Sequence, residues 1–114
     1  MRKILLIWFL AISVCQISAQ TVVTETEIID SNGLKALVSS NKGKPVLINF
    51  WATWCGPCHS EFPDLIKIDA DYRKKGLIFN IVSVDSVGLI DSGVSEFLRQ
   101  YKSTMPSYLI DLAN

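Results

Sequence analysis

Two nearly continuous apolar runs stand out along the chain, and each has the length of a buried strand. They are residues 46–52 (VLINFWA) and residues 77–85 (LIFNIVSVD). A run without polar alternation is typical of a strand covered on both faces, so we expect both to be buried and the first to be central in a sheet. Residues 21–30 alternate loosely and predict an edge strand, and residues 106–111 predict a further strand.

Segments with helical periodicity separate these strands. We expect a short helix over residues 33–41, capped by Ser31 or Asn32. A longer helix should begin within residues 54–59 (WCGPCH), kink at Pro63 and end at the segment RKKG. A third helix carries an apolar stripe at positions i, i+3, i+4 and i+7, formed by Val94, Phe97, Leu98 and Tyr101. Strands that alternate with helices in this way predict an α/β fold with a largely parallel sheet.

The N-terminal segment has the pattern of a secretory signal peptide. Two basic residues precede an apolar run at residues 4–14, and Ala19 supplies the small residue that signal peptidase prefers. This run is shorter than the ~20 apolar residues that span a bilayer. We therefore expect residues 1–19 to be removed and residues 20–114 to form one domain in the periplasm or another extracytoplasmic space. A lipoprotein acylated at Cys15 and an uncleaved anchor are the alternatives.

Charge and cysteine content narrow the function further. The chain has 11 basic and 11 acidic side chains, so nothing favours a nucleic-acid partner. Removal of the signal peptide leaves one pair of cysteines, Cys55 and Cys58, in an oxidising compartment. A bridge between them would close a very short loop and would constrain the unfolded chain little. A purely structural disulfide therefore explains the pair poorly.

Residues 54–59 are compatible with three chemistries: a dithiol redox centre, half of a zinc site, or a c-type haem attachment site. Zinc requires about four ligands, and the chain has a single histidine. The haem interpretation fits the C-x-x-C-H spacing and would make the protein a c-type haem electron carrier, with Met105 as a candidate sixth ligand. The rigid proline in the loop and the buried strand before it argue against haem. We expect no metal and no cofactor.

The position of the pair favours the dithiol. A thiol at a helix N-terminus meets free N–H groups and a partial positive charge, which lower its pKa. We expect Cys55 to cap the helix and to attack a disulfide, and Cys58, one turn later, to resolve the mixed disulfide. Pro57 fixes a helical φ, and Gly56 is expected to let the turn form. His59 is then expected to be an exposed helix residue.

The residues around the cysteine pair also resemble a known protein family. Residues 46–63, VLINFWATWCGPCHSEFP, resemble the active-site segment of thioredoxin-like proteins: the strand, the tryptophan before the first cysteine, the Gly-Pro dipeptide and the helix proline all match. Within that superfamily the segment is most similar to the extracytoplasmic TlpA/ResA-type thiol-disulfide oxidoreductases. These often have asparagine where cytoplasmic thioredoxins have a buried aspartate, here Asn49, and a glutamate three residues after the second cysteine, here Glu61.

The resemblance covers about residues 25–114. It implies a thioredoxin-like fold, in which helices flank a mostly parallel or mixed sheet. It also implies an extracytoplasmic oxidoreductase that acts as a reductant through Cys55 and Cys58, with Glu61 handling the proton of Cys58. Trp54, Gly56 and Pro57 would contact the substrate.

The partners that the resemblance implies are disulfide-bearing exported proteins, apocytochrome c among them, and a membrane protein that re-reduces the pair. A thioredoxin-like peroxidase, which needs no second cysteine in this spacing, and a non-catalytic binding module are further alternatives to this reading.

The resemblance breaks towards the C-terminus. The family has a cis-proline that packs against the cysteines, and Pro106 is the candidate for it. Residues 94–111, however, are more similar to a helix and strand that the family inserts before that proline. In that alignment the cis-proline, the last hairpin and the final helix are missing. If Pro106 is the cis-proline, the final strand and helix still do not fit after Asp111, so we expect the sequence to be truncated at its C-terminal end.

Overall fold

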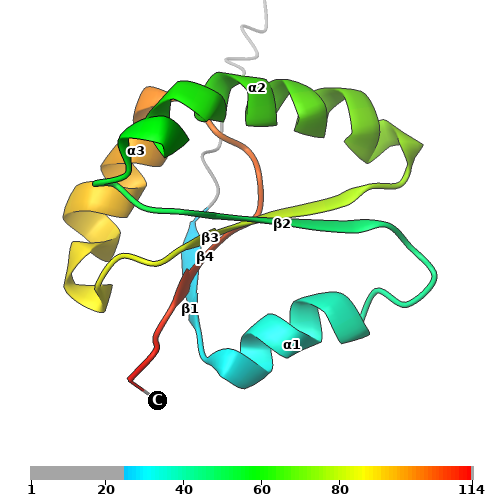
Figure 1. Ribbon diagram of the computed structural model, residues 1–114, viewed down its shortest axis with the longest axis horizontal. Coiled ribbons are helices and arrows are strands. Elements are labelled where there is room, and N and C mark those ends of the chain that lie inside the picture. Colours follow the sequence, from blue (N-terminus) through cyan, green and yellow to red (C-terminus); the bar gives the residue numbers. More distant parts are fainter. Residues whose placement is uncertain (1–24, 114) are drawn as a thin grey trace, which may run out of the picture.

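The computed structural model describes residues 25–113, so the predicted signal peptide and Cys15 lie outside the described residues. Strands and helices alternate along this range (Figure 1). The main elements are β1 (Thr26–Ile29), α1 (Ser31–Ser39), β2 (Val46–Trp51), α2 (Gly56–Tyr72), β3 (Ile78–Ser83), α3 (Ser95–Gln100) and β4 (Ser107–Ile110). Single turns connect some of them: 3₁₀ turns at Arg73–Lys75 and Val87–Leu89 and a π-helical turn at Ile90–Val94.

The four strands of the described range form one parallel sheet in the order β1-β4-β3-β2. Helices α2 and α3 lie on one face of this sheet and α1 lies on the other (Figure 1). The expected α/β fold with a largely parallel sheet is confirmed, and β1 is an edge strand as predicted. Because all strands are parallel, their carboxyl ends meet at one end of the sheet, where β2 leads into the cysteine motif.

The core lies between the sheet and the helices α2 and α3. Its centre is an aromatic cluster in which the Phe97 ring lies 4.5 Å from Trp51, 4.7 Å from Phe62 and 4.7 Å from Tyr101, measured between ring centroids. The predicted apolar stripe is confirmed, since Val94, Phe97 and Leu98 are buried and Tyr101 is half-buried. This packing fixes α2, and with it the cysteine motif, on the end of the sheet.

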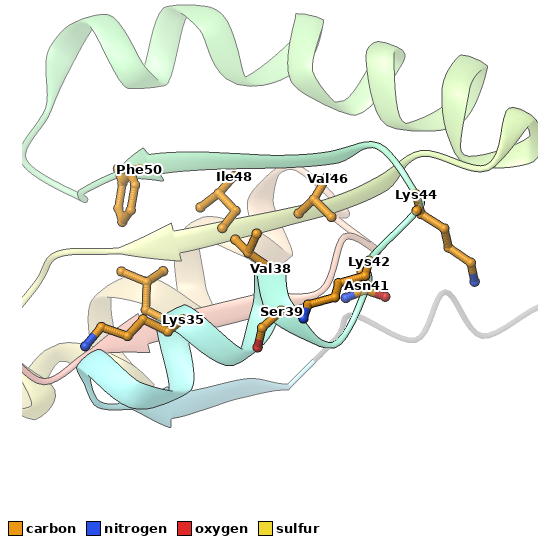
Figure 2. A pocket seen from close by; sticks show the side chains of 11 residues that line it. Lys35, Val38, Ser39, Asn41, Lys42, Lys44, Val46, Ile48 and Phe50 are labelled. Atoms are coloured by element: carbon orange, nitrogen blue, oxygen red, sulfur yellow. The ribbon is translucent and has the colours of Figure 1, made fainter.

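Strand β2 differs from the expectation of a central strand covered on both faces. It pairs only with β3 within the described sheet, and its Phe50 side chain is 51% exposed. Val46, Ile48 and Phe50 point towards α1 and line a groove of about 800 Å³ together with Val38 of that helix (Figure 2). An apolar run indicates that a strand tends to be buried. Within the described residues, however, β2 has one neighbouring strand, and the short helix α1 leaves Val46, Ile48 and Phe50 partly uncovered.

The start of α1 also differs by one residue from the prediction. Asp30 is the cap, and its Oδ1 accepts a hydrogen bond from the Gly33 N–H at 2.7 Å, whereas Ser31 is the first helical residue. Gly33 is required by close approach, because a Cβ at this position would lie 2.8 Å from the Cβ of Ile29. The chain can therefore turn from β1 into α1 without a connecting loop.

Helix α2 continues through Pro63 although proline has no N–H to donate. The carbonyl that this N–H would have bonded, four residues earlier, belongs to His59. Tyr101 donates to that oxygen instead, with 3.3 Å between Oη and O. Within residues 25–113, none of the helices combines the length and the apolar content needed to cross a membrane.

Candidate active site

The two cysteines lie where the carboxyl end of β2 passes into α2. Cys55 is the N-cap of the helix, in extended backbone conformation, and its Sγ accepts a hydrogen bond from the Cys58 N–H at 3.3 Å. Cys55 and Cys58 are joined by a disulfide, with their Cα atoms 5.3 Å apart. The expectation that Cys55 caps the helix is confirmed. A sulfur held there can leave as a thiolate, because the free N–H groups of the first turn stabilise its negative charge.

The surroundings of Cys55 are open on one side. Trp54 is 74% exposed, and Gly56 and Pro57 are also exposed in the first turn of α2. The expectation that the turn needs a glycine is wrong: Gly56 is not among the described glycines with positive φ, and a Cβ added there would have no atom within 4 Å. The proposed contacts of these three residues with substrate stay a prediction.

Glu61 lies on α2 three residues after Cys58, and its side chain is exposed. Cys58 is partly buried and packs against the aromatic core. Residues at i and i+3 share one side of a helix, so the sequence places the carboxylate on the side of Cys58. Its role as the proton acceptor for Cys58 stays a prediction.

His59 is not the exposed residue that the sequence suggested. Its ring is half-buried, edge-on to Phe97 at a centroid distance of 4.6 Å, and its Nε2 lies 2.7 Å from the carbonyl oxygen of Thr53. A carbonyl oxygen can only accept, so Nε2 carries the proton and donates. The first turn of α2 faces α3 because of the aromatic cluster, and this contact draws the imidazole inwards.

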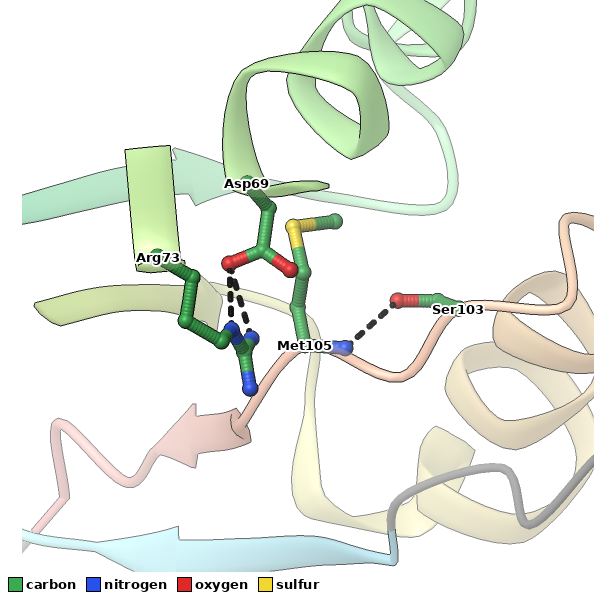
Figure 3. Close-up of polar contacts among 4 residues, drawn as sticks. All are labelled: Asp69, Arg73, Ser103 and Met105. Atoms are coloured by element: carbon green, nitrogen blue, oxygen red, sulfur yellow. Dashed lines mark hydrogen bonds and ion pairs between the residues drawn. The ribbon is translucent and has the colours of Figure 1, made fainter. Parts of the chain in front are cut away.

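The geometry does not support the haem alternative. The Nε2 of His59 is occupied by its bond to Thr53. Met105 precedes β4 and is therefore at the amino end of the sheet, opposite the cysteines. It is buried beside Asp69 of α2 and Arg73 of the 3₁₀ turn that follows (Figure 3). In the described part of the chain, no cluster of three or more His, Cys, Asp or Glu side chains could hold a metal ion.

Pro106 is not the cis-proline of the predicted site. The described residues contain no cis peptide bond, and Pro106 lies directly before β4, where its carbonyl accepts the Ile81 N–H at 3.0 Å. It is thus at the amino end of a parallel sheet whose carboxyl end carries the cysteines. The preferred alignment, in which residues 94–111 are an inserted helix and strand, agrees with this placement.

Asp85 ends the second apolar run, and no role was predicted for it. Its side chain is 4% exposed and accepts hydrogen bonds from the Thr53 N–H at 2.9 Å, the Thr53 hydroxyl at 2.6 Å and the Ser83 hydroxyl at 2.7 Å. The signal that could have indicated it is a carboxylate at the carboxyl end of a buried parallel strand, the end where functional side chains of such sheets gather. Thr53 belongs to the short segment that leads into Cys55.

Comparison with known proteins gives one family and a set of related sequences. A family model described as Redoxin matches residues 18–114. The thiol-disulfide oxidoreductase ResA of Oceanobacillus iheyensis is 41% identical over 69 residues, which are 60% of this chain and 34% of the relative. ResA of Bacillus subtilis is 38% identical over 80 residues, 70% of this chain and 43% of that protein. The chain thus spans less than half the length of these curated relatives.

Solved structures show the same likeness. The thioredoxin domain of a thiol-disulfide oxidoreductase from Bacteroides vulgatus superposes with a TM-score of 0.57 at 28% identity, covering 65% of this chain and 51% of that one. A secreted Mycobacterium tuberculosis disulfide oxidoreductase, homologous to E. coli DsbE, gives a TM-score of 0.52 at 26% identity, covering 66% and 52%. The expected thioredoxin-like fold is confirmed.

Proposed function

Because the chain belongs to the Redoxin family, we propose that it is an extracytoplasmic thiol-disulfide oxidoreductase that reduces disulfides in exported proteins. The observation that carries this proposal is the Cys55–Cys58 disulfide at the N-terminus of α2, with the Cys58 N–H bonded to the sulfur of Cys55. A disulfide across two residues adds little stability, so its chemistry explains it better than its mechanical effect.

The reaction begins with the reduced pair. The Cys55 thiolate attacks one sulfur of the substrate disulfide, a mixed disulfide forms, and the second substrate sulfur leaves as a thiolate that takes up a proton. Cys58 then loses its proton and attacks the Cys55 sulfur. This step closes the Cys55–Cys58 disulfide and releases the first substrate sulfur as a thiolate, which is also protonated. Two electrons pass from the protein to the substrate, which ends as a dithiol.

Glu61 is the group that we assign to the second step. Cys58 is partly buried against the apolar core, and its thiol must lose a proton before its sulfur can attack Cys55. The Glu61 carboxylate is exposed and lies three residues further along α2, so it can take the proton and pass it to solvent. Substrate contact is assigned to the exposed Trp54, Gly56 and Pro57 around Cys55.

Partners and location follow from the same proposal. One structural relative is a secreted disulfide oxidoreductase, and the N-terminal sequence has the pattern of an export signal. The substrates would be exported proteins with accessible disulfides, apocytochrome c among them. Since each cycle leaves the pair oxidised, a membrane protein must return two electrons to it.

The proposal is tested by equilibrating the protein in graded mixtures of reduced and oxidised dithiothreitol and counting free thiols by mass after alkylation. We expect a single two-thiol transition at Cys55 and Cys58, more reducing than the glutathione couple. A transition well above that couple would make the protein an oxidase or isomerase. Failure of either thiol to titrate would overturn the redox function.

A further inference from the structure

Thr53 is held from three directions in the short segment between β2 and α2. Asp85, at the end of β3, accepts from its N–H and its hydroxyl. His59, in the first turn of α2, donates to its carbonyl oxygen at 2.7 Å. Its methyl group lies against the π-helical turn, where a Cβ at Gly93 would stand 3.4 Å away. Every hydrogen-bonding group of Thr53 is thus engaged.

The way in which Asp85 is satisfied is unusual for a buried carboxylate. A charge removed from water is costly unless it is paired or fully hydrogen-bonded. The hydrogen bonds to the Asp85 carboxylate come from two hydroxyls and one amide, all neutral, and two of these three donors belong to Thr53. Most of the stabilisation from these charge-assisted hydrogen bonds therefore depends on where Thr53 lies.

Thr53 lies where the chain passes from β2 into α2. Trp54 and Cys55 follow Thr53 directly, and the bond from the Cys58 N–H to the Cys55 sulfur requires that Cys55 keep its extended capping conformation. We propose that Thr53, clamped by Asp85 and His59, is a positioning residue that holds the sulfur of Cys55 over the N-terminus of α2. The proposal deepens the proposed function and rests on it, since it concerns how the attacking sulfur is set.

The reactivity of Cys55 should therefore change when the hydrogen bonds that hold Thr53 are removed. A thiolate displaced from a helix N-terminus loses the N–H groups that stabilise it, so the pKa of the thiol rises. One unit of increase lowers the thiolate fraction about tenfold at a pH below that pKa. A merely structural role for Asp85 would lower the stability of the fold and would leave this titration where it was.

The test measures the rate at which iodoacetamide alkylates Cys55 in the reduced full chain, as a function of pH, with the modified peptide identified by mass spectrometry. Thr53→Val removes the hydroxyl donor and keeps the shape, Asp85→Ala removes the acceptor, and Asp85→Asn removes the charge but can still bond Thr53. Asp69→Ala and Asp69→Asn are matched controls, because Asp69 is a second buried carboxylate, bonded to Arg73 in the later turns of α2.

We expect Thr53→Val and Asp85→Ala to move the alkylation profile to higher pH and to slow the reaction about tenfold at neutral pH. Asp85→Asn keeps one acceptor oxygen for Thr53 and should therefore shift the alkylation profile less than Asp85→Ala does. The alkylation rates of both Asp69 variants should stay within about twofold of that of the parent chain. Unchanged profiles for Thr53→Val and Asp85→Ala would overturn the proposal. So would equal shifts for Asp85→Asn and Asp85→Ala, which would assign the effect to charge.

If Asp85→Ala does not fold, Thr53→Val and Asp85→Asn decide the question between them. Alkylation needs no protein substrate, so it reports on the position of Cys55 even if the protein reduces none. The dithiothreitol titration of the parent chain separately decides the redox function. An unchanged alkylation profile would therefore refute the role of Thr53, whereas a missing dithiothreitol transition would refute the redox function.

Discussion

The two ends of the sheet each hold a buried carboxylate, 4% exposed for Asp85 and 6% for Asp69, and they satisfy it in different ways. At the amino end, Asp69 near the end of α2 accepts two bonds, at 2.9 and 2.8 Å, from Arg73 in the 3₁₀ turn that follows (Figure 3). At the carboxyl end, Asp85 accepts bonds from neutral groups of Ser83 and Thr53. The first arrangement pairs the carboxylate with a cation nearby in the chain, and the second joins the end of β3 to the segment that leads into Cys55.

The difference shows that equal burial need not mean an equal role. Arg73 is half-exposed, so water can replace much of what Asp69 offers it. Water can replace less around Asp85, because Ser83 and Asp85 are buried where β3 ends and Thr53 is half-buried. We therefore expect substitutions at the carboxyl end to affect both stability and reactivity, and those at the amino end to affect stability alone.

The largest expected effect is on the free energy of unfolding of Asp85→Ala. This substitution leaves one amide and two hydroxyls without an acceptor, which should lower the unfolding free energy by about 3 kcal/mol. Asp69→Ala should cost about 1 kcal/mol, because the Arg73 that it releases is partly solvated. Urea unfolding of both variants measures the two values. Equal losses would remove the distinction between the two ends.

The next effect concerns Arg73 itself. Arg73→Met keeps the apolar stem of the side chain but leaves Asp69 without its cation, and should cost about 1 kcal/mol after solvent screening. The redox equilibrium of Cys55 and Cys58 in dithiothreitol should not move. A shifted equilibrium would show that substitutions at the amino end of the sheet also affect the reactivity of the cysteines, which we do not expect.

A smaller effect is expected at the carbonyl that Pro63 leaves free. Tyr101→Phe removes the hydroxyl that donates to His59 O at 3.3 Å, and should lower the unfolding free energy by about 0.5–1 kcal/mol. Tyr72→Phe is the control, because Tyr72 is the last residue of α2 and half of its side chain is exposed. Equal values for the two variants would mean that the Tyr101 bond contributes nothing measurable.

The smallest effect is expected at Gly56. A Cβ there would meet no atom within 4 Å and the backbone needs no positive φ, so Gly56→Ala should change the unfolding free energy by less than about 0.5 kcal/mol. Thermal unfolding measures this directly. A large loss would show that the turn at Cys55 depends on glycine after all, and that the carboxyl end is more strained than its φ values indicate.

The fold and the cysteine pair were predictable because their signals are local. Alternating strands and helices follow from periodicity, and the capping position of Cys55 follows from its place between the apolar run at residues 46–52 and a helix. The edge position of β2 was not predictable, since hydrophobicity says that a strand prefers cover and not which neighbours provide it.

The inward turn of His59 and the role of Asp85 could not be read from the sequence either. Both depend on Thr53, which lies 6 residues from His59 and 32 from Asp85 in the chain. A polar residue next to an apolar run is usually solvated, and only the packing of α2 against α3 and the convergence of β2 and β3 make these two bonds. Contacts of this kind are set by tertiary structure, which no local pattern reports.

The assignment of Cys55 as the attacking sulfur and Cys58 as the resolving sulfur can be tested by trapping the mixed disulfide. Reduced Cys58→Ser and Cys55→Ser variants are each incubated with oxidised insulin, and covalent adducts are mapped by mass spectrometry. We expect a stable mixed disulfide between Cys55 and insulin in Cys58→Ser and almost none in Cys55→Ser. An adduct that forms as readily through Cys58 in the Cys55→Ser variant would contradict this assignment.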